Sequence, residues 1–349
     1  MRDFQDMKKN LLLISGLIVF LFLSNAANSQ NSEQAKPVTP LGLDGLKNTL
    51  SFVRGSETTR GVWPRVVKYG FKIYDFKTDA FTQEEKTIEI KKKPWRIIPH
   101  AVGVAEILWA ICPRERLVAF NELSANPEFS FIADQVRAKG PIFQSKQTEL
   151  IIGYQPDLVF TVFYSGGDFK KKLKQAKIPY CDLGYFGTIE SIKEQILLIG
   201  KIIGEESNAL ALLKLIDDKI LELKGNLPKM AKPIRVLYYD EGGYIPGISS
   251  NFNSICKIIG AINVGAEQGI KSWSQIDNET LLKWNPDVIA VPEGSNLKKQ
   301  LMSSKVLSHA QAIKNGKVYY VPKAYLGGDS QYMVLSANLL AGIIYAQKF

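Results

Sequence analysis

The sequence contains little of the side-chain chemistry on which most enzymes and metal proteins depend. Its 349 residues include three cysteines and two histidines: Cys112, Cys181, Cys256, His100 and His309. Three scattered cysteines exclude a disulfide framework or a metal knuckle, although one pair could form a bridge that the sequence does not identify. Two histidines exclude a zinc cage built from several imidazoles.

Motifs of the common catalytic sites are absent as well. The chain has no G-x-S-x-G elbow, no phosphate-binding loop and no H-E-x-x-H helix. The glycine-rich segments at residues 165–168 and 327–330 are better explained as turns at strand ends. We therefore expect that the protein is not an enzyme and that it holds no cofactor or metal ion of its own.

The apolar run near the N-terminus, residues 11–23, is short for a membrane span, which needs about 20 residues. Lys8 and Lys9 precede it and small residues follow as far as Ser29, which is typical of a cleavable secretory signal. No cysteine lies near the cleavage region, which argues against lipid attachment. We predict a signal peptide at residues 1–29, cleaved at a point known only to within a few residues, and a soluble periplasmic protein. A retained membrane anchor is the alternative.

The chain is basic, with a formal net charge of +10, and 46% of its residues are hydrophobic. This composition and length indicate a globular protein with a substantial core and two domains. An exported protein is not expected to meet nucleic acid, so the positive charge suggests an anionic ligand or an anionic membrane surface. Clusters such as residues 91–93 and 170–172 can also be solvated faces, and we favour that interpretation for most of them.

A helical region divides the chain near its middle. Thr188 is placed to cap a first helix of regularly spaced isoleucines that ends at Gly204, and Ser207 is placed to cap a second helix that ends at Gly225. The second helix would have roughly 18 residues and span about 27 Å, the width of a small domain. We predict that residues 188–227 form a rigid helical linker between two lobes.

One sequence pattern occurs on both sides of this linker. Residues 149–160 read ELIIGYQPDLVF and residues 279–290 read ETLLKWNPDVIA. In each copy a glutamate opens a short amphipathic helix, Pro-Asp ends the helix, and an apolar run follows that is typical of a buried strand. The repeat predicts two related α/β lobes.

The remaining segments complete the expected organisation. Residues 30–62 are polar and rich in proline and glycine, which predicts an extension with little regular structure whose role the sequence does not indicate. Alternating apolar residues then predict a hairpin over 66–90 with its turn around 75–85. Short strands are expected at 94–99 and 117–120, flanking a loop at 100–103 and a helix that ends before Pro113. The predicted domains are an N-terminal extension, an N-terminal lobe, the linker and a C-terminal lobe: residues 30–65, 66–187, 188–227 and 228–349.

The segment RIIPHAVGVAEIL, residues 96–108, resembles the opening strand, loop and helix of the periplasmic binding proteins for ferric siderophores, haem and cobalamin that serve ABC importers. Further segments that look like landmarks of this family follow in the family's order: residues 140–143, both Glu-to-Pro-Asp units, the linking helix, and residues 235–239, 259–264 and 316–322. The resemblance extends from about Phe71 to the C-terminus. The sequence departs from it in the long extension and in His100, which replaces a small polar residue.

This resemblance implies two Rossmann-like α/β lobes joined by a long rigid helix, with the ligand cleft between them. It also implies a monomeric solute-binding protein that captures a metal chelate and delivers it to the permease subunits in the inner membrane. A ferric siderophore is the first candidate, and cobalamin or haem comes next; the sequence does not identify the chelate. The alternatives from other classes are an exported enzyme or a sensor module on the same two-lobed frame.

Ligands of open α/β sheets bind beyond the carboxyl ends of the strands, and in this chain the side chains expected there are mostly aromatic. Large rings with a few polar groups suit a bulky, partly apolar chelate. Ordinary core packing is the alternative for each ring, and Trp273 is the strongest candidate for a ligand contact. The predicted ligand-binding residues are His100, Phe143, Phe163, Tyr164, Tyr244, Trp273 and Tyr325.

His100 has two interpretations. It could ligate haem iron, or it could form a hydrogen bond within the first loop, which we favour because residues 121–131 lack the tyrosine that haem binders of the family offer.

Glu149 and Glu279 head the two repeated helices. Each carboxylate can complement its helix N-terminus, which is worth about 0.3 to 1 kcal/mol. The resemblance implies a second role, since glutamates at these positions in the family form salt bridges with arginines of the membrane subunits. We therefore predict that both residues dock the protein onto the transporter.

Overall fold

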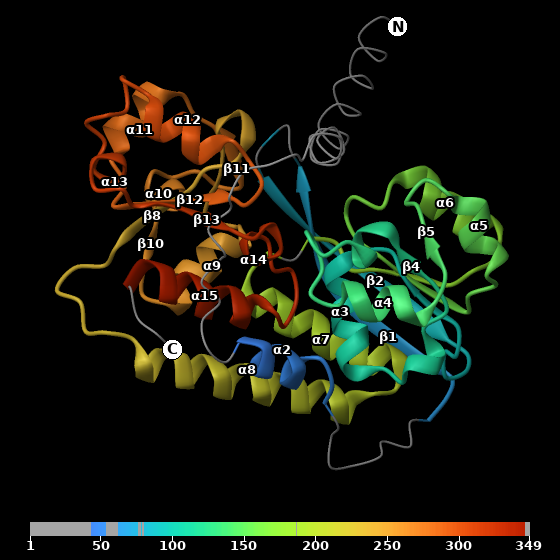
Figure 1. The fold of residues 1–349 in the computed structure, drawn as a ribbon. Coiled ribbons are helices and arrows are strands. Elements are labelled where there is room, and N and C mark those ends of the chain that lie inside the picture. The colour runs from blue at the N-terminus through green and yellow to red at the C-terminus, as the bar shows by residue number, and fades with distance from the viewer. Residues whose placement is uncertain (1–42, 54–61, 76–77, 79, 186, 346–349) are drawn as a thin grey trace, which may run out of the picture. The chain divides into compact units, whose positions relative to one another are not determined.

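Two parallel β-sheets form the centres of two α/β lobes in the computed structural model (Figure 1). The model describes residues 43–53, 62–75, 78, 80–185 and 187–345, all within one compact unit of the chain. The predicted signal peptide and most of the predicted extension lie outside these residues. Two packed lobes with parallel sheets confirm the α/β fold class.

The N-terminal lobe contains a sheet with the strand order β3-β6-β7 and a separate parallel pair, β4-β5. Its helix α3 lies inside the lobe, so all but one of its ten residues are buried. The strands are β3 (Ile97–Pro99), β4 (Phe120–Asn121), β5 (Ile142–Phe143), β6 (Leu158–Thr161) and β7 (Tyr180–Asp182). The helices are α3 (Val102–Ile111), α4 (Ala133–Lys139), α5 (Thr148–Gly153) and α6 (Gly167–Gln175).

The C-terminal lobe contains a parallel sheet with the order β10-β8-β12-β13 and an antiparallel pair, β11-β9. The strands are β8 (Arg235–Tyr238), β9 (Tyr244–Pro246), β10 (Ile262–Asn263), β11 (Trp273–Gln275), β12 (Val288–Pro292) and β13 (Val318–Val321). The helices are α9 (Asn251–Ile258), α10 (Val264–Glu267), α11 (Asn278–Trp284), α12 (Leu297–Ser303), α13 (Gln311–Lys314), α14 (Lys323–Leu326) and α15 (Met333–Tyr345).

Helices α7 (Ile189–Ile203) and α8 (Glu206–Asn226) connect the lobes, and α8 contacts both α3 and α15 (Figure 1). Thr188 caps α7 as predicted, in a capping box with Ser191, and Gly204 ends it with a φ of 74°. A side chain at Gly200 would put its Cβ 2.5 Å from Ala209, so this glycine lets the two helices approach closely.

The predicted bounds of the second helix were wrong at both ends. The helix begins at Glu206, two residues after the reversal at Gly204, and the carbonyl of Glu205 accepts the first helical hydrogen bond from Ala209. At the other end the helix continues through Gly225 to Asn226. It stops there because Leu227 precedes a proline, which favours the extended conformation that this residue adopts.

Arg116 ties the N-terminal lobe to the helix junction. Its guanidinium is completely buried and donates hydrogen bonds of 2.7 Å to the carbonyl oxygens of Pro94 and Ile203. It also lies 2.7 Å from a carboxylate oxygen of Glu205, which accepts a second contact from Lys93. Each of the three guanidinium nitrogens therefore has an acceptor, as a buried ion pair requires.

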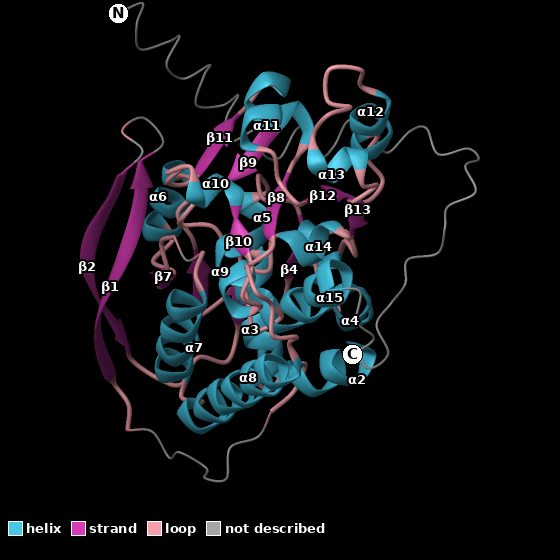
Figure 2. Ribbon diagram, turned by 90° about the vertical axis from the view of Figure 1, so that its left-hand side faces the viewer, coloured by secondary structure: helices cyan, strands magenta, loops and turns pink. Residues whose placement is uncertain are grey.

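The predicted hairpin is present, with β1 (Arg65–Asp75) paired to β2 (Ala80–Ile90) from Arg65↔Ile90 to Asp75↔Ala80. The turn lies between residues 75 and 80, so the prediction of a turn around 75–85 was wrong. Residues 82–85 are polar although they belong to strand β2, because their side chains face solvent. The hairpin contacts the N-terminal lobe through a bridge between Lys72 and Tyr185 (Figure 2 shows it from another side).

Three further predictions needed correction. The expected extension contains helix α2 (Leu43–Leu50), which contacts α15 and buries Leu43 and Leu50, so tertiary packing gives this polar stretch a regular structure. The strand expected at 94–99 begins only at Ile97, because the Asp157 carboxylate accepts the preceding backbone N–H groups. The strand expected at 117–120 occupies Phe120–Asn121.

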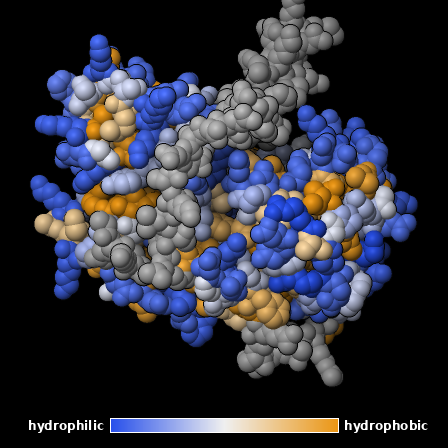
Figure 3. Space-filling view, viewed as in Figure 1, coloured by the Kyte–Doolittle hydropathy of each residue, from blue (hydrophilic) through white to orange (hydrophobic). Residues whose placement is uncertain are grey.

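The cysteines and the surface complete the description. All three cysteines are buried and free, so none of them is bridged. Within the described ranges, no helix is long and apolar enough to cross a membrane. Figure 3 shows one face of the molecule, on which hydrophilic residues cover most of the outer surface and hydrophobic residues gather in small patches.

Candidate functional site

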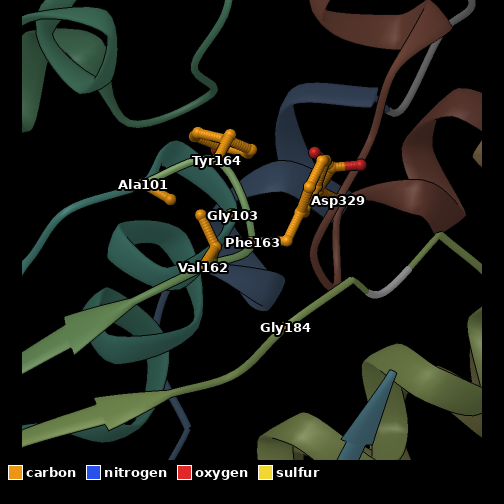
Figure 4. A pocket seen from close by; sticks show the side chains of 7 residues that line it. All are labelled: Ala101, Gly103, Val162, Phe163, Tyr164, Gly184 and Asp329. Atoms are coloured by element: carbon orange, nitrogen blue, oxygen red, sulfur yellow. The ribbon is translucent and has the colours of Figure 1, made fainter. Parts of the chain in front are cut away.

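A hollow lies where the carboxyl ends of the N-terminal strands meet a loop of the C-terminal lobe (Figure 4). Its lining comes from the loop after β3 and the start of α3, the loops after β6 and β7, and the segment before α15. The lining residues are Ala101, Gly103, Val162, Phe163, Tyr164, Gly184 and Asp329. This position matches the edge of a parallel sheet at which ligands bind in α/β proteins.

The start of α3 touches the C-terminal segment at Gly103. A Cβ atom at this position would lie 2.4 Å from the carbonyl oxygen of Asp329 and 2.9 Å from its Cβ. Any larger residue would push the two segments apart, so the glycine is required for this contact. The contact brings an acidic group of one lobe to the binding edge of the other.

Phe163 and Tyr164 provide the aromatic surface of the hollow. Their rings meet edge to face at 5.0 Å, and 53% of the surface of Tyr164 is exposed. Phe163 also packs at 5.2 Å against Tyr185, whose hydroxyl donates a 3.1 Å hydrogen bond to the carbonyl of Ser249 in the C-terminal lobe. Tyr185 was not among the predicted residues, although it follows strand β7 and the same reasoning would have found it.

Two carboxyl groups lie at this junction. Glu106 is buried in α3; its Oε1 accepts the N–H of Phe131 at 2.8 Å, and its Oε2 lies 2.5 Å from the hydroxyl of Ser330. Asp329 is half-buried, and its carboxylate accepts a hydrogen bond from Asn251. Burial raises the pKa of Glu106 to about 7, and burial together with the nearby Glu106 raises the pKa of Asp329 to about 7.

The sequence prediction missed both acids. The sequence does contain an indication for Glu106, because this glutamate is the one charged residue in the otherwise apolar helix α3. Asp329 had been assigned to a turn, and its loop gave no sign that the fold returns it to the first lobe.

His100 and Phe143 lie deeper, in the core of the N-terminal lobe. Phe143 is completely buried, and the His100 ring stacks at 4.3 Å on Phe169 and at 6.0 Å on Phe143. His100 Nδ1 lies 3.0 Å from the hydroxyl of Ser165, so the histidine forms a hydrogen bond with the loop after β6 and not within the first loop. Burial lowers the pKa of His100 to about 4, which keeps the imidazole neutral at physiological pH.

Trp273 and Tyr244 belong to the antiparallel pair of the C-terminal lobe. In this ladder Trp273 lies opposite Pro246, and Tyr244 lies opposite Gln275. Trp273 is 44% exposed and meets the ring of Tyr238 edge to face at 5.8 Å. A partly exposed indole on a supported strand is a suitable contact surface for a ligand.

Tyr325 lies at a second hollow, between the N-terminal and C-terminal lobes. It packs edge to face on Phe131 at 4.8 Å, and the hollow also includes Lys47 of α2 and Asp134 of α4. The predicted aromatic residues therefore fall into separate groups: Phe163 with Tyr164, Trp273 with Tyr244, Tyr325 alone, and His100 with Phe143 in the core.

The two repeated units have matching structures. Helices α5 and α11 each begin one residue before their glutamate, and Gln155 and Asn285 at their ends both have a positive φ, of 47° and 46°. Glu149 is exposed and pairs with Lys172, which lowers the pKa of its carboxyl. Glu279 is also exposed, and it forms no ion pair with a described residue.

Searches against known proteins gave consistent matches. A family model described as periplasmic binding protein matches residues 103–325. A protein of Bacillus subtilis (strain 168), named as the uncharacterized ABC transporter substrate-binding lipoprotein YvrC, is 24% identical over 279 residues, which are 78% of this chain and 85% of that protein. The petrobactin-binding protein YclQ of the same organism is 29% identical over 209 residues, which are 56% of this chain and 63% of the relative.

Solved structures share the fold. A possible iron-binding (periplasmic solute-binding) protein from Staphylococcus epidermidis ATCC 12228 aligns with a TM-score of 0.65 at 20% identity, covering 73% of this chain and 100% of that one. This agreement confirms the two-lobed α/β fold. Because the family model spans more than half of the sequence, the chain belongs to the periplasmic binding protein family.

Proposed function

We propose that the protein is the substrate-binding component of an ABC importer. In this proposal a cleavable signal exports it as a monomer to the periplasm, where it captures a metal chelate for the permease subunits in the inner membrane. A ferric siderophore is the first candidate, and cobalamin or haem comes next. Membership of the family supports a binding role, and the names of the two Bacillus relatives support ABC import and a siderophore.

The observation that carries this proposal is the group of aromatic rings at the junction of the lobes, around a small hollow of about 20 Å³. Phe163 and Tyr164 line it at the carboxyl ends of parallel strands. Trp273 and Tyr244 on the C-terminal lobe and Tyr325 at the second hollow are further partly exposed rings, which lie outside this lining. We assign the ligand contacts to these five residues. His100 and Phe143 support the N-terminal side from within the core.

Purification from the native periplasm tests the proposal, because tight ligands often remain bound. We expect a visible absorption band from the metal chelate and a matching small molecule in the mass spectrum. Protein denatured and washed before refolding is the control for adsorbed colour. Colourless protein without a bound small molecule, which also fails to bind added ferric siderophores, cobalamin and haem, would contradict a chelate-binding role.

For the transporter we propose that Glu149 and Glu279 are the docking residues. Their helices α5 and α11 occupy equivalent places in the two lobes, on the side away from α8 (Figure 1). Two exposed acids at equivalent positions suit a permease with two-fold symmetry. Docking must displace Lys172 from Glu149, so we expect the two lobes to contribute unequally.

The double variant Glu149→Lys and Glu279→Lys tests this assignment. We expect normal ligand affinity and thermal stability but loss of uptake, with milder and salt-dependent defects in the single variants. The matched control reverses Glu222, which pairs with Lys219, and the exposed Glu194 on α7. Normal uptake in cells that contain only the docking double variant would refute the assignment.

A further inference from the structure

Asp329 and Glu106 lack a basic partner in the part of the chain that the structure describes. The ion pairs of that part include neither residue. Asp182 differs from them, because its buried carboxylate forms ion pairs with both Lys86 and Lys170. A chain with a formal charge of +10 therefore has, at the junction of its lobes, two acids that no lysine or arginine of the described residues contacts, and Lys47 acts on Glu106 only from a distance.

The surroundings of Asp329 suit a positively charged group. Its side chain lies beside Phe163 and Tyr164 in the hollow, and the lining contains no lysine, arginine or histidine among the described residues (Figure 4). Aromatic rings attract cations through their negative faces, and a carboxylate adds a charge-assisted hydrogen bond. Phosphate-like or polycarboxylate groups would meet repulsion at the same place.

We propose that Asp329 selects the ligand by charge, so that the site prefers cationic chelates to neutral ones and neutral chelates to anionic ones. The proposal rests on the chelate-binding function proposed above and narrows its substrate class. The half-buried carboxyl of Asp329 accepts a hydrogen bond from Asn251 but contacts no lysine or arginine among the described residues, and a cationic group of the ligand would stabilise its ionised form. The charge of the site, and not the net charge of the chain, then decides which ligand enters.

A matched series of probes tests the order of affinities. Ferrioxamine B is a ferric trihydroxamate with a pendant ammonium; acetylation of that amine makes it neutral, and succinylation makes it anionic. Aquacobalamin and cyanocobalamin form a second pair, cationic and neutral, and a ferric tricatecholate provides a strongly anionic chelate. Affinities are measured by isothermal titration of the full exported chain at neutral pH and low salt.

Within each series that binds, we expect the affinity for the cationic member to be about tenfold to a hundredfold higher than the affinity for the neutral or anionic member. This ratio corresponds to the free energy of one charge-assisted hydrogen bond. In Asp329→Asn this difference should disappear. Asparagine keeps an oxygen for the hydrogen bond from Asn251 and adds no volume beside Gly103. The control Asp218→Asn on α8 changes the net charge equally and should preserve the difference.

Four outcomes would overturn the proposal. The first is equal or tighter binding of an anionic member by the unmodified protein, a result that does not depend on whether a variant folds. The second is a charge preference that persists in folded Asp329→Asn. Binding of the tricatecholate alone would overturn charge selection and leave the proposed function standing, whereas no binding of any probe would overturn both.

Discussion

Replacement of Glu106 by glutamine should change how the stability of the protein depends on pH. In the folded protein the pKa of Glu106 is raised from 4.5 to about 7 by burial. The folded state therefore binds a proton more tightly than the unfolded state. The stabilising contribution of the protonated group is complete below pH 4.5 and is lost as the pH rises through 7.

The magnitude follows from the size of this change. One pKa unit corresponds to about 1.4 kcal/mol, so a rise from 4.5 to about 7 corresponds to about 3 kcal/mol as an upper value. Glutamine is neutral at every pH and keeps the geometry, because its oxygen can accept the N–H of Phe131 and its amide can donate to Ser330. Relative to the unmodified protein, the variant should gain up to about 3 kcal/mol between pH 4.5 and pH 8.

Other ionisable groups near Glu106 do not obscure this difference. Asp329 faces it from the loop before α15, and Lys47 of α2 acts on it more weakly. Burial lowers the pKa of His100 to about 4, so its contribution has the opposite sign and is lost as the pH falls below 6.5. Lys47 and His100 are present in both proteins, so their effects cancel in the comparison. The pKa of Asp329 falls when the Glu106 charge is removed, which changes stability in the same direction as the loss of Glu106 itself.

Urea unfolding followed by tryptophan fluorescence at half-unit steps from pH 4.5 to 8.5 would measure the effect. Glu115→Gln, at an exposed position just after α3, controls for the loss of one acidic group. A difference in unfolding free energy that stays constant across this range would refute the reasoning, because it would mean that Glu106 does not change its protonation on folding.

Further predictions concern the ligand, the core and the lobes. Trp273→Ala should weaken chelate binding by about 1 to 3 kcal/mol in a titration while the melting temperature stays nearly constant; unfolding with unchanged affinity would show that the indole is structural. Arg116→Met should lower the unfolding free energy, measured in urea, by about 3 to 5 kcal/mol. The control Arg137→Met, at an exposed position, should lower it by less than about 1 kcal/mol. Equal effects of the two substitutions would contradict the role of the buried ion pair. Small-angle scattering with and without ligand should show little change in the radius of gyration, because α8 contacts both lobes along one continuous helix; a large decrease would rule out a rigid linker.

Local sequence patterns predicted the repeated units well. The glutamate, the Pro-Asp step and the apolar strand of each copy occupy the expected places, and so do the cap at Thr188 and the reversal at Gly204. These features depend on neighbouring residues, because capping, proline geometry and alternation act over a few positions of the chain. The hairpin was predicted for the same reason, although its exposed polar strand residues were mistaken for a turn.

The interior of the site depended on distant segments. Asp329 reaches the carboxyl ends of the N-terminal strands because Gly103 allows the chain to return against α3, more than two hundred residues earlier in the sequence. Tertiary packing likewise gave α2 a structure that its polar composition did not suggest, and it buried Phe143, which local reasoning placed at the cleft.

The sequence by itself determined the two α/β lobes, the linking helices and the positions of the two glutamates that head the repeated helices, since periodicity and capping are properties of short segments. Only the tertiary structure decided which aromatic rings face the hollow and which acids lie there. The pKa values of Glu106 and Asp329 rise because burial removes water from groups that no local pattern marks as neighbours. Burial and charge compensation are sums over contacts between remote parts of the chain, and these contacts exist only after the lobes have packed.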